Sequence, residues 1–292
     1  MISIYKQDNL RQGRSERPQE LIKIKKTFSF RFIRIVTDLY NFFYPEALKY
    51  DALTPEESLK LLLKSGKSLI RFGNGESEIL VGLDMPTQIY NRELAKGLAN
   101  IIKDYNADSN YLLALANWNL TKSVRELKDS HKKRKYRMWR YMRYLFFRFR
   151  MGEKKLPFLE TDMFRDLIRG LDKSKIETLW SNFNHIIIVH NNEKYFKWLS
   201  EEYRDKKFYY VKIPDKNFFS VLPETQKKIT TIVNEYNIDR NDLVVMVSAG
   251  PGANILCYNL CQKAENILCY DMGNFFYNHF HSSQQHESGV LN

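Results

Sequence analysis

Residues 65–83 read SGKSLIRFGNGESEILVGL. The apolar run at 68–72 predicts a short strand, which stops at the glycine-rich turn 73–75. From Glu76 onward the spacing of apolar residues becomes that of a helix. The stretch therefore predicts a strand, a tight turn and the first turn of a helix.

This turn has the residue types of a metal–phosphate site. Gly73 and Gly75 let the backbone turn sharply and leave room for a ligand close to the main chain. The helix start offers unpaired N–H groups, and Asn74 and Glu76 offer oxygen atoms of the kind that Mg²⁺ or Mn²⁺ binds. The alternative is an ordinary strand–helix turn, in which Asn74 and Gly75 adopt left-handed conformations and Glu76 favours the helix dipole.

The rest of the chain alternates apolar strands with helices. Further strands are expected at 111–116, 185–190, 208–213, 243–247 and 267–270. Several of these are apolar throughout, as strands are when helices cover both faces of a parallel sheet. We therefore predict an α/β fold with a Rossmann-like, mostly parallel sheet and helices on both faces.

Polar and glycine-rich residues follow the predicted strands, at points that would meet along one edge of the sheet. They are 73–76, Asn117, 190–191, Pro214, 248–252 and 271–273. Ligands of open parallel sheets bind beyond the carboxyl ends of the strands. We therefore expect the functional site at this edge.

The composition is that of a globular protein without a membrane-spanning segment. Of the 292 residues 43% are hydrophobic, and no apolar run approaches the roughly 20 residues that cross a bilayer. Residues 1–20 are polar and contain no signal-peptide core. We expect the three cysteines, Cys257, Cys261 and Cys269, to be buried, reduced thiols of a cytoplasmic protein.

The net charge of +12 is concentrated in two basic segments. Residues 131–155 hold eleven Lys or Arg against one acid, and residues 1–35 hold nine against three. The chain is predicted to contain a basic N-terminal segment with a helix, an α/β domain with a basic helical insertion, and a disordered tail. Their expected bounds are 1–50 for the segment, 51–280 for the domain with its insertion at 121–160, and 281–292 for the tail.

The insertion contains a strongly amphipathic helix at 132–150. At 100° per residue its Met, Tyr, Leu and Phe side chains face one side and its arginines the other. One hypothesis is contact with an anionic membrane surface, at the inner face of the membrane. The alternative is packing on the body or on a sister subunit of a homo-oligomer; nucleic-acid binding is least expected, because no recognised module surrounds the segment. Residues 21–44 leave open the same choice between packing and membrane contact.

Three segments match, in order, the motifs of a known family. Residues 70–76 read IRFGNGE, residues 213–219 read IPDKNFF, and residues 243–273 follow a strand–G-P–helix–strand–D-x-G pattern. The first resembles the R-F/Y-G-D-G-E signature of the bacterial GT-D-fold glycosyltransferases, and the second is similar to their P-x-x-N-A-F segment. The resemblance spans 59–280 apart from the insertion. It implies a metal-assisted glycosyltransferase that uses a nucleotide-sugar.

Two positions depart from the family pattern. The D-x-E of the signature is Asn74-Gly75-Glu76 here, so the predicted metal site has one negative charge fewer. Where the family usually has a histidine after D-x-G, this chain has Asn274. Either change could mean altered metal use, altered sugar choice or lost activity.

The resemblance implies roles for residues along the predicted edge. Glu76 and Asn74 would bind Mn²⁺ or Mg²⁺ at the diphosphate of the donor, and Glu76 and Asp271 are the candidate catalytic residues. Candidate substrate-binding residues are Arg71, Gly73, Gly75, Pro214, Asn217, Ser248, Gly250, Gly252 and Gly273. Arg71 could instead form a salt bridge within the sheet, Asp271 a helix cap, and Asn217 a loop support.

The predicted function is transfer of a sugar from a nucleotide-sugar, expected to be UDP-linked, to a cell-surface glycan or glycoprotein intermediate. A lipid-linked glycan at the membrane is included among the acceptors. Two other classes remain open: a glycan- or partner-binding protein of the same fold with a weakened metal site, and a basic nucleic-acid-binding protein. The catalytic base is not identified, and His190 is a weaker candidate for it.

Overall fold

The computed structural model describes residues 28–43, 53–115, 148–149, 151, 156–169, 173–262 and 265–287. Within these residues the strands are β1 (Ser68–Phe72), β2 (Tyr111–Leu115), β3 (Leu159–Glu160), β4 (His185–His190), β5 (Lys207–Lys212), β6 (Leu243–Val247) and β7 (Cys269–Asp271). The α-helices are α2 (Phe28–Phe43), α3 (Pro55–Ser65), α4 (Asn74–Leu80), α5 (Arg92–Asp104), α9 (Met163–Arg169), α10 (Lys173–Ser181), α11 (Lys194–Glu202), α12 (Leu222–Glu235), α13 (Pro251–Gln262) and α14 (Phe275–Glu287), and the 3₁₀ helices are η3 (Phe218–Val221) and η4 (Arg240–Asp242).

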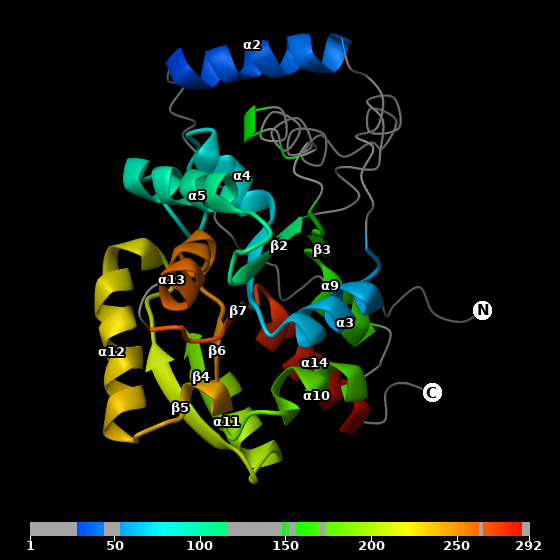
Figure 1. Cartoon of the computed structure of the whole chain (residues 1–292), viewed down its shortest axis with the longest axis vertical. Coiled ribbons are helices and arrows are strands. Elements are labelled where there is room, and N and C mark those ends of the chain that lie inside the picture. Colours follow the sequence, from blue (N-terminus) through cyan, green and yellow to red (C-terminus); the bar gives the residue numbers. More distant parts are fainter. Residues whose placement is uncertain are drawn as a thin grey trace, which may run out of the picture.

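The strands form one parallel sheet in the order β3-β2-β1-β7-β6-β4-β5 (Figure 1). Ser68 of β1 lies opposite Tyr111 of β2, and Leu69 pairs with Tyr270 of β7. Because all strands point the same way, the carboxyl ends of β1, β7 and β6 lie side by side in the middle of one edge. The α/β class and the Rossmann-like parallel sheet are confirmed.

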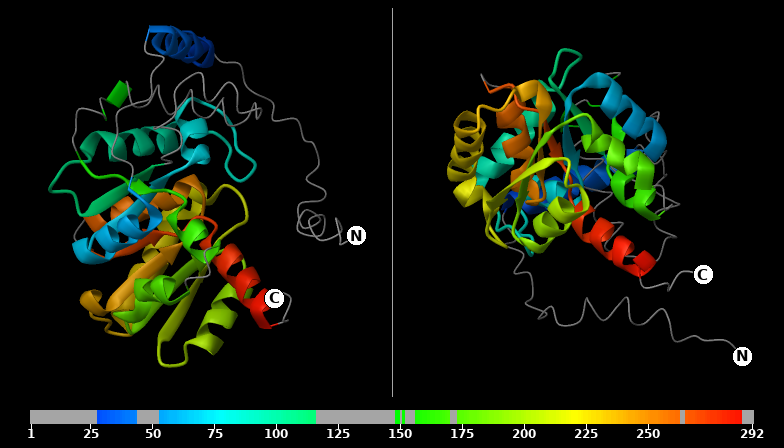
Figure 2. Two further views of the ribbon diagram at one scale, coloured as in Figure 1. Left: turned by 90° about the vertical axis from the view of Figure 1, so that its right-hand side faces the viewer. Right: turned by 90° about the horizontal axis from the view of Figure 1, so that it is seen from below.

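Helices cover both faces of the sheet (Figure 2), because alternate residues of a strand point to opposite faces. On one face Ile70 and Val245 pack with residues of α4, α5, α12 and α13. On the other face Leu69 and Ile188 pack with residues of α3, α9, α10, α11 and α14. The strands are buried from both sides, and this is why their sequences are apolar throughout.

Helix α3 begins with a capping box formed by Thr54 and Glu57. The Glu57 N–H donates a hydrogen bond of 3.2 Å to Thr54 Oγ1, and the Thr54 N–H donates one of 2.8 Å to Glu57 Oε2. Pro55 takes the first helical position, and Gly66 ends the helix with φ at 61°. Leu62 on this helix is fully buried against the sheet.

Part of the predicted insertion at 121–160 belongs to the sheet. Leu159 and Glu160 form the edge strand β3 beside β2, and α9 follows directly. A two-residue strand has too short a pattern to be recognised in a sequence. Of the predicted amphipathic helix at 132–150, residues 148–149 are described, and Phe149 packs against the core; the rest lies outside the described ranges.

The predicted disordered tail, 281–292, is helical as far as Glu287, where α14 ends. The sequence there is polar and lacks helical apolar spacing, but burial orders the helix. Ser283 is buried, and the ring of His279 lies against two tryptophans, 6.1 Å and 4.8 Å between ring centroids. The residues after Glu287 lie outside the described ranges.

The three cysteines are free and buried, as the sequence predicts. Cys257 on α13 and Cys269 on β7 face each other, and their sulfur atoms lie 2.9 Å apart. Burial raises the pKa of the Cys257 thiol well above its usual range. The thiol is therefore kept in its unreactive, protonated form.

The two edge strands differ from the central ones. β3 has two residues, and β5 carries exposed lysines, Lys207 and Lys212, at its two ends. Charged ends and very short strands are ways in which proteins limit pairing at a sheet edge. The apolar strands β1, β4, β6 and β7 lie inside these edges.

Helix α2 lies at one end of the molecule, beyond α4 and α5 (Figure 1). It falls within the helix expected at 21–44, but Phe32, Ile35 and Leu39 are exposed rather than packed on the body. Among the helices in the described ranges, none is both long enough and apolar enough to cross a membrane.

Candidate active site

The turn after β1 has the geometry that the sequence predicts. Gly73 precedes α4, and its N–H donates a hydrogen bond of 2.8 Å to Oε2 of Glu76. The carboxylate of Glu76, buried with 8% of its surface exposed, thus satisfies a free N–H at the helix start. Asn74 is the first residue of α4, and the structure describes its backbone.

Glu76 and Asp271 form a buried pair of carboxyl groups at neighbouring strand ends. Asp271 ends β7, which lies beside β1. Loss of hydration, followed by the charge of Asp271, raises the pKa of Glu76 to about 7. Burial raises the pKa of Asp271 to about 6, although the Gly273 N–H donates a hydrogen bond of 3.0 Å to Asp271 Oδ1. The pair therefore concentrates negative charge that is only partly compensated.

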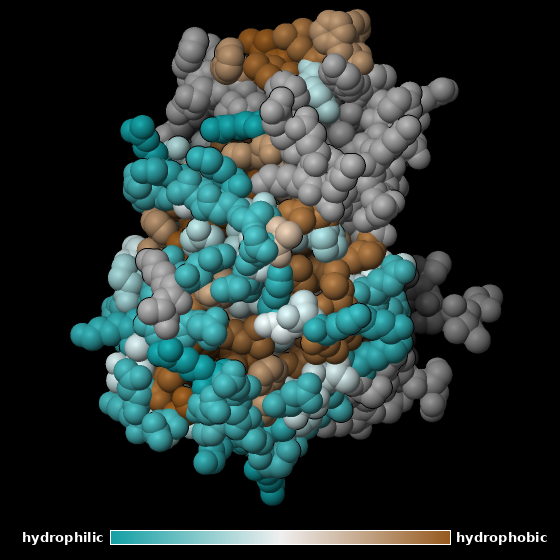
Figure 3. Space-filling view, in the orientation of Figure 1, coloured by the Kyte–Doolittle hydropathy of each residue, from teal (hydrophilic) through white to brown (hydrophobic). Residues whose placement is uncertain are grey.

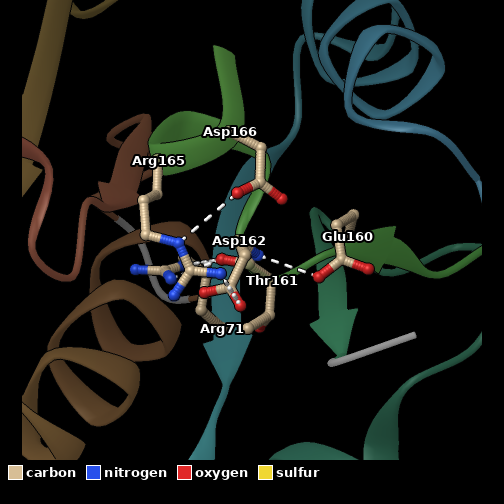
Figure 4. Close-up of polar contacts among 6 residues, drawn as sticks. All are labelled: Arg71, Glu160, Thr161, Asp162, Arg165 and Asp166. Carbon is tan, nitrogen blue, oxygen red and sulfur yellow. Dashed lines mark hydrogen bonds and ion pairs between the residues drawn. The ribbon is translucent and has the colours of Figure 1, made fainter. Parts of the chain in front are cut away.

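Arg71, at the end of β1, supplies positive charge to this pair. Its guanidinium acts to lower the pKa of both carboxyl groups. Arg71 Nε donates a hydrogen bond of 2.8 Å to the Thr161 carbonyl, and Nη2 donates to the same oxygen (Figure 4). Both bonds end on a carbonyl rather than on a carboxylate, so they do not neutralise the charge of Arg71. The salt bridge considered as the alternative is not what holds this side chain.

Gly273 has no side chain, and this leaves space for the guanidinium of Arg71. A Cβ at this position would lie 1.7 Å from Nη1 of Arg71, so a larger residue would displace the guanidinium. Gly273 also has a left-handed backbone, with φ at 52°. The D-x-G segment is therefore matched to Arg71 both in space and in backbone conformation.

The turn between β3 and α9 fixes the carbonyl that holds Arg71 (Figure 4). The Asp162 N–H donates a hydrogen bond of 3.0 Å to Glu160 Oε1, and Arg165 forms an ion pair with Asp162. A cavity of about 40 Å³ lies beside them and is lined in part by Arg71 and Arg165. This support was not predicted, because Thr161 lies 90 residues from Arg71 along the chain.

Gly75 lets two helix starts approach each other. A Cβ at Gly75 would lie 2.2 Å from Met85 Cε and 3.6 Å from Pro251 Cγ. The starts of α4 and α13 therefore meet here, with Met85 of the loop at 84–91 lying over the glycine. The sequence predicted room for a ligand at Gly75, but the side chains of Met85 and Pro251 occupy that space in the structure.

The start of α13 carries three of the predicted binding residues. Ser248 follows β6, its N–H donates to the Val189 carbonyl at 3.0 Å, and its buried Oγ has no hydrogen-bond partner among the described atoms. Gly250 has φ at 60°, and a Cβ at Gly252 would lie 2.5 Å from Phe218 Cδ1. The two glycines thus serve a tight strand–helix junction, and a role of Ser248 in substrate binding stays a prediction.

Asn217 anchors the loop at 84–91. Its N–H donates a hydrogen bond of 2.8 Å to the Thr87 carbonyl, and its Oδ1 accepts one of 2.9 Å from the Ile89 N–H. Its backbone is left-handed, with φ at 58°. The amide oxygen is used within the protein, in the loop-supporting role, and contact of Asn217 with a substrate stays a prediction.

Two candidates lie away from the carboxyl pair. Pro214 is exposed after the edge strand β5, and β4 and β6 separate that strand from β7. His190 ends β4, its Nδ1 accepts a hydrogen bond of 2.9 Å from the Asn192 N–H, and its ring packs on Tyr195. Burial lowers the pKa of His190 to about 4. These contacts indicate a structural role for His190 rather than a role in proton transfer.

Asn254 belongs to the site and was missed from the sequence. It is fully buried on α13, and its Nδ2 donates a hydrogen bond of 2.7 Å to the Arg71 carbonyl. Its Oδ1 has no hydrogen-bond partner among the described atoms. An amide in the otherwise apolar start of a helix was the available signal, because a buried amide needs a polar partner.

The residues present fit a divalent cation whose shell is completed by a substrate. In the described part of the chain, no group of three His, Cys, Asp or Glu side chains could hold a metal alone. Loss of hydration and, after it, the charge of Asp271 raise the pKa of Glu76, and a cation bound at Glu76 would oppose the second of these effects. Mg²⁺ is commonly held by one or two carboxylates together with substrate phosphates.

The sequence is similar to those of proteins described as glycosyltransferases. A family model described as the glycosyltransferase GT-D fold matches residues 69–287. A curated relative, the probable glycosyl transferase Gly of Streptococcus gordonii, is 36% identical over 58 residues. That match spans 20% of this chain and 8% of the relative, so the chain corresponds to a small part of that protein.

Solved structures share the architecture. One described as a new glycosyltransferase from Streptococcus sanguinis has a TM-score of 0.61 at 18% identity, with 82% of this chain and 86% of that chain covered. A domain of unknown function 1792, described as having a distinct glycosyltransferase fold, has a TM-score of 0.57 at 19% identity, with 89% and 86% covered. At these identities the likeness shows a common fold. Since the family model covers most of the sequence, the chain belongs to the glycosyltransferase GT-D fold family.

Proposed function

We propose that the protein transfers a sugar from a UDP-sugar to a cell-surface glycan or glycoprotein intermediate. Membership of the GT-D fold family supports glycosyl transfer. The observation that carries the proposal is the buried pair of Glu76 and Asp271, with Arg71 beside it, at the carboxyl edge of the sheet. Donor, acceptor and metal are parts of the proposal.

Arg71 and the start of α13 would bind the leaving diphosphate. The barrier to transfer falls when fixed positive charge and N–H donors already face the place where negative charge develops. Arg71 is held by the Thr161 carbonyl and keeps its charge, so it is oriented before a substrate arrives. The first N–H groups of α13, after Gly250, are further donors of the kind that bind phosphate.

Glu76 and Asn74 are the proposed ligands of a divalent cation, Mn²⁺ or Mg²⁺. When bound, the cation would supply further charge for the diphosphate oxygens. The Gly73 N–H orients the Glu76 carboxylate through a hydrogen bond of 2.8 Å to Oε2. Asn74 brings no charge, so we expect weaker metal binding than an aspartate would give. This substitution favours the second candidate, a glycan- or partner-binding protein of the same fold without turnover.

Asp271 is the proposed base. With a pKa of about 6 it is largely ionised at neutral pH, yet it holds a proton more readily than an exposed aspartate. Hydrogen bonds from the Gly273 N–H, to Oδ1, and from the Arg71 backbone hold this carboxyl group in place. Asp271 would therefore accept a proton or position a hydroxyl group.

Release of UDP from a panel of UDP-sugars, with Mn²⁺ or Mg²⁺, tests the proposal. Wild type should release UDP in a metal-dependent manner, and Glu76→Ala should lower the rate about 100-fold or more, as loss of a central electrostatic group does. Glu93→Ala, at an exposed glutamate in the first turn of α5, is the matched control and should keep the wild-type rate.

Other outcomes identify the alternatives. Equal release by wild type and Glu76→Ala would show that this carboxylate is not part of the chemistry. Tight glycan binding without release supports the binding protein. Binding of DNA or RNA alone, weakened by salt, supports a nucleic-acid-binding protein instead.

The proposed acceptor class includes lipid-linked glycans at the inner face of the membrane. The basic segment 132–150 would hold the enzyme there, since each basic residue adds about 1 kcal/mol at an anionic surface. Neutralising Arg137, Arg140 and Arg143 together should reduce sedimentation with anionic vesicles at low salt. Unchanged sedimentation would assign the segment to packing on the body or on a second subunit, as the contact of Phe149 with the core already suggests for its end.

A further inference from the structure

Helix α2 presents an apolar face that the described body leaves uncovered. Five large apolar side chains are each more than half exposed: Phe32 at 58%, Ile35 at 58%, Leu39 at 53%, Phe42 at 78% and Phe43 at 68%. Figure 3 shows hydrophobic residues gathered on α2, at one end of the molecule. An exposed apolar area of this kind marks a surface that binds something.

The five residues form one stripe. Successive steps between them are three, four, three and one residues, and at 100° per residue these positions share one side of a helix. In sixteen residues the helix therefore separates a strongly apolar side from the rest. A helix with one apolar side along its whole length can bind a surface through that side.

Charge identifies the surface that fits this helix. Residues 21–43 contain five Lys or Arg, at 23, 25, 26, 31 and 34, against one acid, Asp38. Aromatic and aliphatic residues on one side combined with a basic surplus are typical of helices that lie in the interface of an anionic bilayer. No helix of the described ranges could cross a membrane, so this one would lie in the membrane plane.

We propose that α2 docks the protein on an anionic lipid surface through Phe32, Ile35, Leu39, Phe42 and Phe43. Figures 1 and 2 place α2 at the end of the molecule where α4 and α5 lie, and α10 and α11 at the opposite end. The docked protein therefore turns the α4 end toward the lipid, and α4 begins at the candidate active site. The family match begins at residue 69, so this surface is separate from the segment that carries the catalytic fold.

The test is sedimentation of the full chain with vesicles of phosphatidylcholine, with and without phosphatidylglycerol. Wild type should bind the anionic vesicles and bind them less tightly as salt is raised. The triple variant Ile35→Gln, Leu39→Gln, Phe42→Gln should bind them about tenfold or more weakly, because it removes apolar area and keeps every charge. Tyr236→Gln, Tyr277→Gln is the matched control, since both tyrosines are exposed on the body, at 60% and 52%.

Two results would overturn the proposal. Equal vesicle binding by wild type and the triple variant would show that the stripe does not touch lipid. A wild type that ignores vesicles but forms a dimer in sedimentation velocity, while the triple variant is a monomer, would assign the stripe to a second copy of the chain. UDP release from a soluble donor should be the same in wild type and the triple variant, so a missing activity would count against the proposed function and not against docking.

Discussion

Glu76 and Asp271 place two acidic groups where water barely reaches. Both are less than a tenth exposed, and neither is matched by a contacting arginine or lysine in the described part of the chain, since Arg71 bonds to a carbonyl. Such an arrangement costs stability in the free protein. Strongly raised pKa values of this kind cluster at catalytic and ligand-binding sites.

The two raised pKa values make a prediction about pH. Because the folded protein holds protons at Glu76 and Asp271 more tightly than the unfolded chain, their stabilising effect is present below about pH 4 and is lost as pH rises through about 6 and 7. Glu76→Gln cannot ionise at this position and should lose less stability over that range. The measurement is the thermal midpoint of both proteins from pH 5 to pH 8, without metal. Parallel curves would show that Glu76 has an ordinary pKa.

Gly273 should be far less replaceable than another glycine of the same backbone conformation. Gly273→Ala adds left-handed strain and pushes Arg71 aside, and we expect a loss of about 3 kcal/mol in unfolding free energy. Gly66→Ala is the control: its φ is 61°, but nothing lies within 4 Å of the added Cβ, so strain alone should cost about 1 kcal/mol. Urea denaturation measures both. Equal losses would mean that Arg71 can move without cost.

At the residue scale, local spacing in the sequence can reveal contacts between near neighbours but not contacts between distant residues. The bond from the Gly73 N–H to Glu76 spans three residues, so spacing reveals it. The Thr161 carbonyl that holds Arg71 lies 90 residues away, after a segment with no recognisable pattern. Only the folded sheet, with β3 two strands from β1, brings the two together.

Among the elements, the loop at 84–91 lies between the start of α4 and Asn217 and contacts both. Met85 covers Gly75, and the loop is tied to Asn217 by two hydrogen bonds. Those bonds hold the loop over the starts of α4 and α13. The loop therefore borders the part of the edge where a ligand is expected.

Asn217 should hold that loop through its side chain. Asn217→Gly keeps the left-handed backbone and removes the acceptor of the Ile89 N–H, so the loop should be cut about tenfold faster in limited proteolysis, which corresponds to a bond of about 1.4 kcal/mol. Lys216→Gly, at the exposed residue before Asn217, is the control and should be cut like wild type. Unchanged cleavage of Asn217→Gly would show that contacts elsewhere hold the loop.

Elements with a long regular pattern were predicted within a few residues of their observed bounds, β4 and β6 among them. β3 and α14 were not, for different reasons. Two residues of strand carry no period, and the second half of α14 is polar although Ser283 is buried. Tertiary packing determines that both elements form, and local spacing of apolar residues does not reveal such packing.

For the whole molecule, the sequence predicted a parallel sheet with helices on both faces. It did not predict the order of the strands in that sheet. Strands apolar throughout required helices on both faces, and both faces are covered. Which strand lies beside which depends on crossovers that spacing does not record. The site could therefore be assigned to an edge of the sheet, but not to the junction of β1 and β7.

Removing residues 1–50 should leave the α/β domain intact. The large apolar residues of α2 are exposed, so their loss should change the thermal midpoint by less than about 2 °C. A chain beginning at residue 67 also lacks α3, with its buried Leu59 and Leu62, and should unfold at least about 10 °C lower or fail to fold. Calorimetry of the two shortened chains checks this. A large loss on removing residues 1–50 alone would place that segment in the core.

The two edge strands of the sheet affect the solubility of this protein. A stack of apolar parallel strands invites neighbouring molecules to add further strands, which is how fibrils grow. Here one outermost strand is only two residues long, and the other begins and ends with an exposed lysine, Lys207 and Lys212. Like charges meeting at Lys207 and Lys212 would repel an incoming copy, so the molecule is protected against self-templated aggregation at the places where its backbone is open.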